Sequence, residues 1–403
     1  MISLDEARAR VLVGLGPGPR GVERVPLDEA VGRVLAEPLV SGVDLPAFDA
    51  SAMDGYAVAT AELGAPPFAL PVEGESRAGG EAGGAGGHRA GGALRIFTGA
   101  PLPPWADAVL PQERASLAGG QVTFEAAPAR GANVRRRGED LARGALALGA
   151  GARLGAAQVP MLAALGLRDV PVARRPRVAL LAVGDELCDP GGGGGAASVV
   201  DSNGPMLAAL VRQAGGEPRR ARVGDDREAV RAALRDAFAS ADLVVTSGGV
   251  SVGAYDYVRR AFEDEGVAFD FGSVAVKPGK PVAFGRRGGA PALGLPGNPA
   301  AAFVTFAMLG LPIVRALQGD LCPAPAPLPA RLAGEARAPE GRVELARARL
   351  TWGPAALGVE LVGGQSSAGL AGLAAADALA WLSAPGGRLP AGSAVPVSPL
   401  ALL

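Results

Sequence analysis

Residues 177–317 alternate short apolar runs with amphipathic segments, a pattern that predicts a parallel sheet covered by helices. The run RVALLAV, 177–183, is apolar after Arg177, as is typical of a strand buried on both faces. Residues 227–241 space their apolar positions as one face of a helix does. Further strands are predicted at 220–226, 243–246, 267–276, 281–287 and 292–295, and further helices begin near Asn203 and Asp256 and run from Pro299 to Leu317.

The segments before this region predict helices and short strands. Residues 3–15 have helical apolar spacing, and Ser3 followed by Glu6 fits a capping box at the start of that helix. Two more helices are predicted at 27–35 and 153–167.

The C-terminal part of the chain, from residue 322, has a spacing of apolar segments that differs from that of the two preceding parts. The proline-rich stretch 322–329 reads as a linker. Beyond it, glycine and proline separate short apolar segments, which predicts a small all-β domain. These segments are 343–352, 356–362, 378–384 and 394–400.

Composition limits the classes of protein that fit. A chain of 403 residues is long enough for several domains, and its 49% of hydrophobic residues can fill their cores. The formal net charge of −1 does not suggest a nucleic-acid partner. No apolar stretch of membrane-spanning length is free of charges and glycines, and the acidic N-terminal segment is not a signal peptide. We therefore expect a cytoplasmic protein without a membrane partner.

The small number of histidines and cysteines excludes some kinds of catalytic and metal site. The one histidine, His88, lies in a glycine-rich stretch, so a Ser-His-Asp triad is not expected. Cys188 and Cys322 lie far apart without a CxxC pattern, which favours two reduced cysteines over a zinc site. Catalysis is left to carboxylates, lysines, arginines, hydroxyls and backbone amides, a set that suits phosphate-like ligands together with Mg²⁺.

The two lysines of the chain are the first candidate for a site. The chain has 39 basic residues, and its only lysines, Lys277 and Lys280, both lie in VKPGKP, 276–281. The prolines stiffen this segment and Gly279 permits a tight turn, so it predicts a loop that presents two ammonium groups. A surface turn with two solvated lysines is the alternative, and the exclusive use of lysine here favours an anion site.

A glycine-rich loop is the second candidate. The buried strand at 243–246 runs into SGGVSVG and then a helix, an arrangement in which consecutive amides and a helix N-terminus can hold a phosphate. The loop lacks both the Walker A ending and the GxGxxG spacing. The predicted phosphate contacts are Ser247, Gly248, Gly249, Ser251 and Gly253.

Several loops are expected to meet at one edge of the predicted sheet. Ligands of open α/β sheets bind at the carboxyl ends of the strands. Asp185 and Glu186 follow the first strand, and Asp225 and Asp226 follow the second. The loops after Val183, Val223 and Thr246 and around Leu295 should therefore converge with VKPGKP.

The first half of the chain offers weaker candidates. In LPAFDASAMDGYAV, 45–58, Asp49 and Asp54 can contact a ligand or metal, or cap a turn. Thr98 can donate to a phosphate or bond its own turn. Of the three arginines at 135–137, at most two can share a site, and a solvated run of charges is the alternative.

Taken together, the motifs resemble the molybdopterin molybdenumtransferase (MoeA) family, which also includes the C-terminal domain of gephyrin. They are FDASAMDGYAV, IFTGAP, RRRGED, VGDEL, DSN, TSGGVSVGAYDYV, VKPGKP and GLPGNP, in this order over essentially the whole chain. The resemblance implies insertion of molybdate into adenylyl-molybdopterin, with Mg²⁺-dependent release of AMP and formation of the molybdenum cofactor. It also implies a homodimer whose active site lies between subunits, and molybdopterin adenylyltransferase and molybdoenzyme apoproteins as further partners.

The resemblance also implies the fold. We expect a multidomain α/β plus β protein with a central MogA-like three-layer α/β domain at 175–321 and a β-rich domain carrying MDGYA at 45–134. An elongated helical linker domain is expected from 1–44 with 135–174, and a small C-terminal β-barrel at 322–403.

The family's functional positions fall on residues of each of these motifs. The implied catalytic residues are Asp54, Thr98, Glu186, Asp256, Lys277 and Lys280. The implied substrate contacts beyond the glycine loop are Arg137, Asp140, Pro296, Pro299 and Ser367. Ala368, which follows Ser367, departs from the family's pattern. The implied Mg²⁺ ligands are Asp185, Glu186, Asp225, Asp226 and Asp256.

Two alternatives remain open at this point. An ATP-dependent molybdopterin adenylyltransferase has a related α/β fold, but one of single-domain length. A non-enzymatic pterin-binding scaffold would bind the ligand without releasing AMP.

Overall fold

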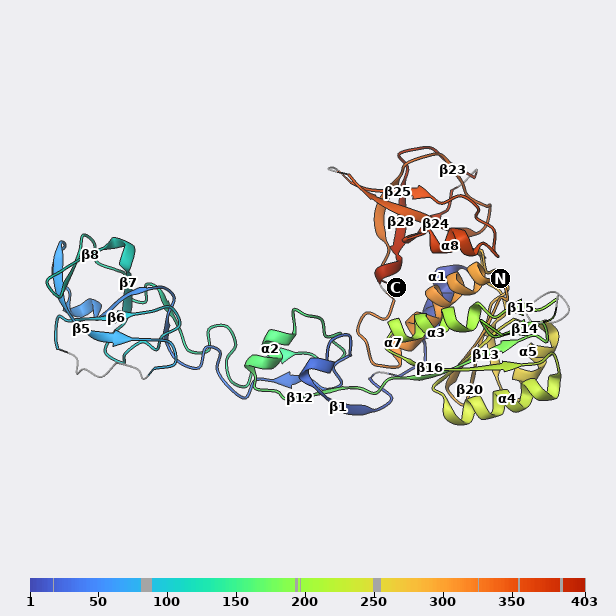
Figure 1. The fold of residues 1–403 in the computed structure, drawn as a ribbon, viewed down its shortest axis with the longest axis horizontal. Helices are drawn as coiled ribbons and strands as arrows, with labels where there is room; N and C mark the ends of the chain where they lie inside the picture. The colour runs from blue at the N-terminus through green and yellow to red at the C-terminus, as the bar shows by residue number, and fades with distance from the viewer. Residues whose placement is uncertain are drawn as a thin grey trace. The chain divides into compact units, whose positions relative to one another are not determined.

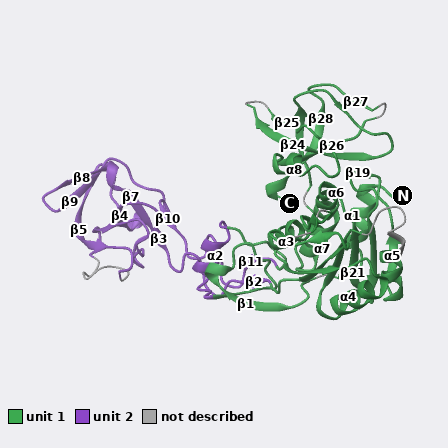
Figure 2. Ribbon diagram, turned by 45° about the vertical axis from the view of Figure 1, so that its right-hand side comes forward, with its two compact units in different colours: residues 1–37, 150–155, 169–403 green, residues 38–149, 156–168 purple. Residues whose placement is uncertain are grey.

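The computed structural model describes residues 1–16, 18–80, 89–192, 195, 197–248, 255–324, 326–353, 356–384 and 387–402. The chain forms two compact units, one of residues 1–37, 150–155 and 169–403 and one of residues 38–149 and 156–168 (Figure 2). Each unit is described by itself.

The first unit is built on a mixed six-stranded sheet. The strands follow the order β16, β13, β17, β21, β20, β18. The first four are parallel, and β20 and β18 run antiparallel to their neighbours. Their bounds are β16 Glu217–Val223, β13 Arg177–Val183, β17 Leu243–Ser247, β21 Ala290–Leu295, β20 Ala283–Arg287 and β18 Ala268–Phe271.

Helices cover both faces of this sheet, which confirms the predicted three-layer α/β domain. Figure 1 shows α3 and α7 on one side of the sheet and α4 on the other. One face packs against α1 Leu4–Leu12, α3 Asn203–Gln213, α6 Pro299–Thr305 and α7 Leu311–Ala316. The other face packs against α4 Arg227–Ser240 and α5 Tyr255–Asp264.

The first helix belongs to this core. Leu4, Ala7 and Val11 of α1 are buried in the same apolar cluster as α7. Ser3 accepts a hydrogen bond from the backbone N–H of Glu6, which is one half of the predicted capping box. The predicted linker domain, 1–44 with 135–174, includes these residues, whereas the helix packs with the α/β domain.

One long apolar helix crosses the core. The turn η4, Phe306–Gly310, is a π-helical turn that joins α6 to α7. Pro299–Ala316 is long and apolar enough to span a membrane, and 89% of it is buried inside the protein. Its apolar character is therefore accounted for by packing in the core of this unit.

A closed five-stranded barrel follows, as predicted. The strands pair in the order β24, β25, β22, β28, β26, and β26 closes on β24. The short strand β19, Val276–Lys277, adds to β24 in parallel. The barrel strands are β22 Leu328–Leu332, β24 Val343–Trp352, β25 Leu357–Leu361, β26 Ala378–Leu382 and β28 Ala394–Pro399, and the barrel region also holds β23 Ala336–Arg337, α8 Leu370–Ala374, β27 Arg388–Leu389 and η5 Leu400–Leu402.

The prediction of a helix at 27–35 is wrong. This stretch contains only the 3₁₀ turn η1, Leu27–Glu29. Gly32 follows with φ +81°, a left-handed conformation that ends any helix there. The neighbouring strands β1, Val22–Pro26, and β12, Asp169–Ala173, form an antiparallel pair.

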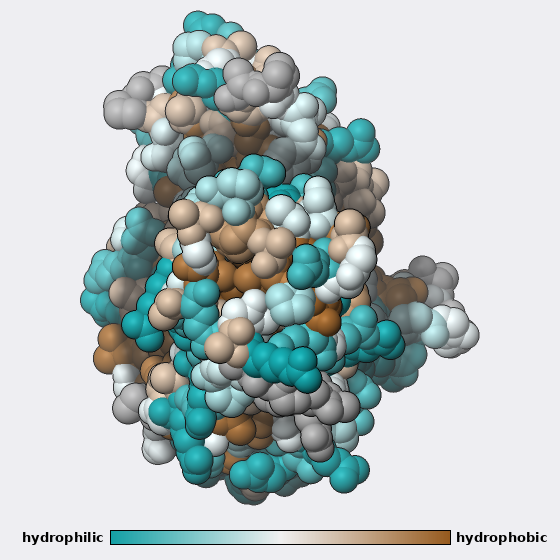
Figure 3. All heavy atoms as spheres, turned by 90° about the vertical axis from the view of Figure 1, so that its left-hand side faces the viewer, coloured by the Kyte–Doolittle hydropathy of each residue, from teal (hydrophilic) through white to brown (hydrophobic). Residues whose placement is uncertain are grey.

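The second unit is a six-stranded β structure with the order β7, β4, β6, β5, β9, β8. Its one helix among the described residues is α2, Val159–Ala164, which is shorter than the predicted 153–167. Figure 3 draws both units by hydropathy, and hydrophobic and hydrophilic residues are interspersed on the face that it shows. The strands are β2 Leu39–Val40, β3 Ala50–Ser51, β4 Gly55–Val58, β5 Phe68–Ser76, β6 Ala93–Ile96, β7 Ala108–Pro111, β8 Ala115–Ala118, β9 Gln121–Phe124, β10 Val134–Arg135 and β11 Leu146–Leu148, with 3₁₀ turns η2 Thr60–Glu62 and η3 Gln112–Arg114.

Candidate functional site

The ends of four parallel strands lie at one edge of the α/β sheet. The strand register pairs Val183 with Val223, and Ser247 with Leu295. The antiparallel strand β20 starts at the same edge, because Ala283 pairs with Gly294. The loop VKPGKP precedes β20 directly and therefore meets this edge, as the sequence analysis predicted.

Two acidic residues are linked across this edge. The backbone N–H of Asp185 donates to Oδ2 of Asp225 over 3.3 Å. The backbone N–H of Asp225 donates to Oδ1 of Asp185 over 3.1 Å. Glu186 is exposed beside them. Asp226 instead caps α4: its carboxylate accepts a hydrogen bond from the backbone N–H of Ala229.

The acid pair fits a magnesium ion in its chemistry. No group of three His, Cys, Asp or Glu side chains that could hold a metal occurs in the part of the chain that the structure describes. Mg²⁺ is commonly held by one or two carboxylates, and its remaining ligands are water and substrate phosphates. Asp185 and Asp225 meet that requirement. The side chain of Asp256 lies outside the described residues.

The glycine loop begins at the same edge. Ser247 is buried at the end of β17. Gly248 has φ +90°, and a Cβ there would lie 2.4 Å from the carbonyl oxygen of Val183. Only glycine lets the loop cross β13 this closely. The predicted phosphate contacts Gly249, Ser251 and Gly253 lie outside the described residues.

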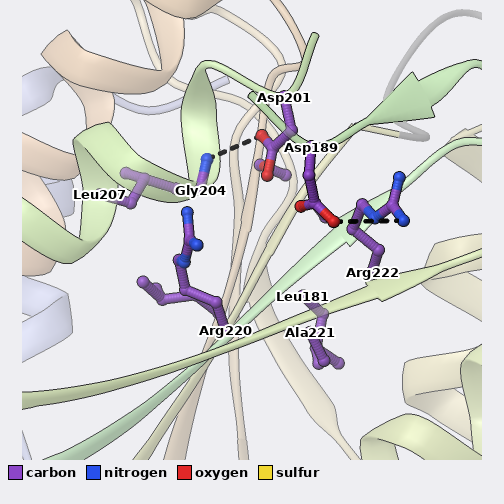
Figure 4. Close-up of a pocket in the computed structure, with 11 residues that line it drawn as sticks. Leu181, Asp189, Asp201, Gly204, Leu207, Arg220, Ala221 and Arg222 are labelled. Carbon is purple, nitrogen blue, oxygen red and sulfur yellow. Dashed lines mark hydrogen bonds and ion pairs between the residues drawn. The ribbon is translucent and has the colours of Figure 1, made fainter. Parts of the chain in front are cut away.

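A pocket of about 190 Å³ opens beside Ser247. We call it the sheet-edge pocket; Arg220, Arg222, Asp189, Asp201 and Gly204 line it together with Ser247 (Figure 4). Asp201 accepts from the backbone N–H of Gly204 over 2.8 Å, and Asp189 pairs with Arg222 over 3.5 Å. Figure 4 shows the side chain of Arg220 extending toward the start of α3. The pocket thus combines a cation, a buried hydroxyl residue and a helix N-terminus.

A second pocket, of about 450 Å³, joins the α/β domain to the barrel. We call it the lysine–serine pocket. It brings Lys277 and Lys280 together with the predicted residues Pro296 and Ser367. The remaining lining residues are Val276, Pro278, Gly279, Pro281, Asn298, Ala301, Arg342, Gln365 and Ser366.

The lysine loop is held from two sides. Gly279 has φ +109°, and a Cβ there would lie 2.2 Å from the side-chain methyl of Thr305 in α6. The hydroxyl of Thr305 donates to the carbonyl of Ala301 over 2.7 Å, which fixes that side chain. On the other side, the ammonium of Lys277 donates to the carboxylate of Glu344 in β24 over 3.1 Å.

The serine loop, 363–369, is fixed to the start of α6. The backbone carbonyl of Ser367 accepts from the N–H groups of Ala300 and Ala301 over 3.0 and 3.3 Å. The side-chain amide of Asn298 donates to the hydroxyl of Ser367 over 3.1 Å. Pro299 opens this helix at its first turn. The structure therefore places Ser367 beside PGNP and the lysine loop.

Arg347 is a site-building residue that sequence reasoning missed. Its side chain is 1% exposed and its guanidinium donates to the carbonyls of Gly364 and Ser366, both over 2.8 Å. Burial lowers the pKa of Arg347. An arginine at an inward position of a barrel strand was the available signal, because such burial requires partners.

In the second unit, Asp54 and Thr98 form one cluster. The backbone N–H and the hydroxyl of Thr98 both donate to Oδ1 of Asp54 over 2.8 Å. The two hydrogen bonds from Thr98 lower the pKa of Asp54, and the positive charge of Arg95 adds to them. Arg95 stacks against Tyr56 and Phe97 at 5.0 and 5.2 Å from the ring centres.

The arginines at 135–137 each have an acidic partner. Arg136 pairs with Asp49 over 2.7 Å, and Arg137 pairs with Asp44 over 2.6 Å. The backbone N–H of Arg137 also donates to Asp49. These hydrogen bonds lower the pKa of Asp49, with the backbone bond as the largest cause. Asp140 is exposed in the same turn.

Comparison with known protein families matches most of the chain in three parts. Residues 2–166 match the MoeA N-terminal region (domain I and II), residues 179–316 match a probable molybdopterin binding domain, and residues 329–400 match the MoeA C-terminal region (domain IV).

Individual relatives point to the same family. The chain is 39% identical to a molybdopterin molybdenumtransferase of Haemophilus influenzae, over 79% of this chain and 78% of the relative. It is 37% identical to molybdopterin molybdenumtransferase 2 of Mycobacterium tuberculosis, over 81% and 82%. Its fold is similar to a molybdopterin biosynthesis MoeA protein from Pyrococcus horikoshii, with a TM-score of 0.84, 28% identity and coverage of 98% and 99%.

Proposed function

Because the chain belongs to the MoeA family of molybdopterin molybdenumtransferases, transferases of molybdenum cofactor biosynthesis, we propose that it inserts molybdate into adenylyl-molybdopterin and releases AMP in a Mg²⁺-dependent step. The observation that carries this proposal is the lysine–serine pocket. Two segments far apart in the sequence, the lysine loop and the serine loop, form it, and both lysines of the chain line it.

In this proposal, the lysine–serine pocket takes the molybdate oxyanion. Lys277, Lys280 and Arg342 supply positive charge, and Ser366 and Ser367 supply hydroxyl groups. A hydrogen bond between a charged donor and an oxyanion contributes about 1.5–3 kcal/mol. The fixed backbone of both loops means that little rearrangement is needed when the anion binds.

The sheet edge takes the phosphate end of the pterin substrate. Ser247 and Gly248 begin the segment SGGVSVG, whose glycine-rich sequence is typical of a phosphate-binding loop, and Arg220 adds a cation to the adjoining pocket. Asp185 and Asp225 would hold Mg²⁺, with Glu186 and Asp256 as further candidates. When bound, the ion neutralises phosphate charge and polarises the bond to be cleaved.

The second unit contributes the other wall of the site in this proposal. Asp54 and Thr98 are candidate catalytic residues, and Arg137 and Asp140 are candidate substrate contacts. We further propose a cytoplasmic homodimer in which these residues come from the partner subunit. Molybdopterin adenylyltransferase would supply the substrate and molybdoenzyme apoproteins would accept the product.

Reconstitution tests the reaction directly. The purified protein is incubated with adenylyl-molybdopterin, molybdate and Mg²⁺, and AMP and molybdenum cofactor are measured. Release of both, dependent on molybdate and Mg²⁺, is the expected result. Pyrophosphate formed from ATP and molybdopterin would indicate an adenylyltransferase, and binding without AMP release would indicate a scaffold.

A further inference from the structure

We propose that Glu344 is a positioning residue for the oxyanion: it holds the ammonium of Lys277 at the wall of the lysine–serine pocket and lowers the positive charge around that pocket by one, which favours a dianion over more highly charged anions. This inference rests on the proposed function of the pocket. It adds a residue of the barrel that does not itself line the pocket.

Glu344 forms a buried ion pair with Lys277. Glu344 is 6% exposed, and both of its carboxylate oxygens lie 3.1 Å from the ammonium nitrogen of Lys277. Among the residues that the structure describes, Lys277 is the only side chain that hydrogen-bonds or ion-pairs with this carboxylate, which also acts on the guanidinium of Arg347 through its charge. The two residues are also register partners in the parallel pairing of β19 with β24.

Burying the carboxylate of Glu344 costs free energy, so its presence indicates a structural or functional role. A buried carboxylate loses its hydration, and one ion pair recovers this loss only in part. A neutral residue of similar size would fill the same position in the strand. The ion pair does, however, fix a long and flexible lysine side chain, which is otherwise free to turn into solvent. The side chain of Lys277 is 45% exposed, on the side facing the pocket and solvent.

The charges around the pocket give Glu344 its second role. Lys277, Lys280 and Arg342 line the pocket as three cations, and Glu344 behind them subtracts one charge. Arg347 lies on the same strand and keeps its own positive charge, while its guanidinium donates to the backbone of the serine loop. Glu344 therefore lowers the positive charge around the ligand by one, which favours a dianion such as molybdate. Without Glu344, the pocket would favour more highly charged anions such as pyrophosphate.

A double-mutant cycle tests the positioning role. Molybdate binding is measured by calorimetry for the full-length protein and for Glu344→Ala, Lys277→Ala and the double variant. We expect each single variant to bind molybdate about tenfold more weakly and the double variant to be no weaker than Lys277→Ala alone, because residues that act as a unit are not additive. Losses that multiply in the double variant would overturn the proposal.

A charge-neutral variant tests the second role and covers a failure of Glu344→Ala to fold. Glu344→Gln keeps the volume and an acceptor for Lys277 but removes the charge. We expect pyrophosphate to compete with molybdate about fivefold better in this variant than in the unmodified protein. An unchanged competition ratio would contradict the charge-limiting role. Glu360→Gln, an exposed acid on β25, is the matched control and should leave both measurements unchanged.

These measurements do not depend on turnover. If the unmodified protein binds molybdate and the cycle is non-additive but no AMP is released, the transferase assignment fails while the role of Glu344 stands. If AMP is released but the cycle is additive, only the role of Glu344 fails.

Discussion

The backbone N–H of Ala300 donates to the carbonyl of Ser367 over 3.0 Å, so a loop of the barrel caps a helix of the α/β domain. The first turn of a helix has N–H groups without partners inside the helix, and here another domain supplies an acceptor. The lysine–serine pocket therefore exists only while the two domains are packed together. Changes that loosen this contact should affect the site before they affect either fold.

The first prediction concerns the charge of Lys280. Lys280→Ala removes an exposed ammonium group from the lysine–serine pocket, and one charge-assisted hydrogen bond to the anion is lost. We expect molybdate affinity to fall about tenfold or more, with no change in thermal stability. Calorimetry and a thermal melt measure the two quantities. Arg388→Ala, an exposed cation paired with Glu335 elsewhere in the barrel, is the control.

The second prediction concerns the backbone of the lysine loop. Gly279→Ala places a Cβ against Thr305 and forces a left-handed conformation on a residue that resists it. We expect a loss of about 1–3 kcal/mol in unfolding free energy and weaker molybdate binding. Adding Thr305→Ser, which removes the opposing methyl, should restore part of the loss. No recovery in the double variant would mean that the conformational strain alone is responsible.

The third prediction separates two neighbouring acids. Asp225→Ala should raise the Mg²⁺ concentration needed for half-maximal AMP release, because it removes one of the two carboxylates at the sheet edge. Asp226→Ala should leave that concentration unchanged and lower stability by about 0.5–2 kcal/mol, because it removes the cap of α4. A magnesium titration and urea unfolding of both variants provide the test, and an exchange of the two phenotypes would contradict the assignment.

The fourth prediction follows from the pKa of Asp54. Thr98 lowers this pKa in the folded protein, so the contact stabilises the fold at pH values above the ordinary pKa of aspartate and loses that effect as the pH falls through the lowered value. Thr98→Val removes the hydroxyl donor and should raise the pKa of Asp54 toward its ordinary value. Carboxyl NMR titration measures the change, and Thr60→Val, whose hydroxyl binds Asp107 instead, is the control.

The fifth prediction concerns Arg347. Arg347→Met keeps much of the buried volume but leaves the carbonyls of Gly364 and Ser366 without their donors. We expect a loss of about 1–3 kcal/mol in stability for each unsatisfied carbonyl. AMP release should fall as well, since Ser367 lies in the loop that these bonds hold. Activity restored to the unmodified level by saturating molybdate would show that only binding, and not the transfer step, depends on this loop.

The periodic parts of the chain could be predicted from sequence. The strand at 177–183 and the helix at 227–240 match their patterns because both are buried along a regular face. The meeting of several loops at one edge of the sheet could also be predicted, because the carboxyl ends of parallel strands lie at the same edge. The predicted helix at 27–35 failed because Gly32 interrupts a plausible helical spacing.

The residues that hold the loops of the lysine–serine pocket in place, Glu344 and Arg347, could not be predicted from local sequence patterns. Glu344 and Arg347 act on loops that lie 67 and 17 to 19 residues away. The pairing of β19 with β24 brings Glu344 to Lys277, and the fold of the barrel brings Arg347 to the serine loop. The choice between Asp225 and Asp226 depends on a single backbone turn that places one carboxylate on the helix cap. Pairings of this kind are set by tertiary packing, which local periodicity does not encode.

The lysine loop has a practical consequence for studying this protein in solution. Since both lysines of the chain belong to that loop, reagents that acylate amines have only it and the chain's N-terminal amine to modify. Mass spectrometry of the acylated protein would thus report occupancy of a single location without any engineered label.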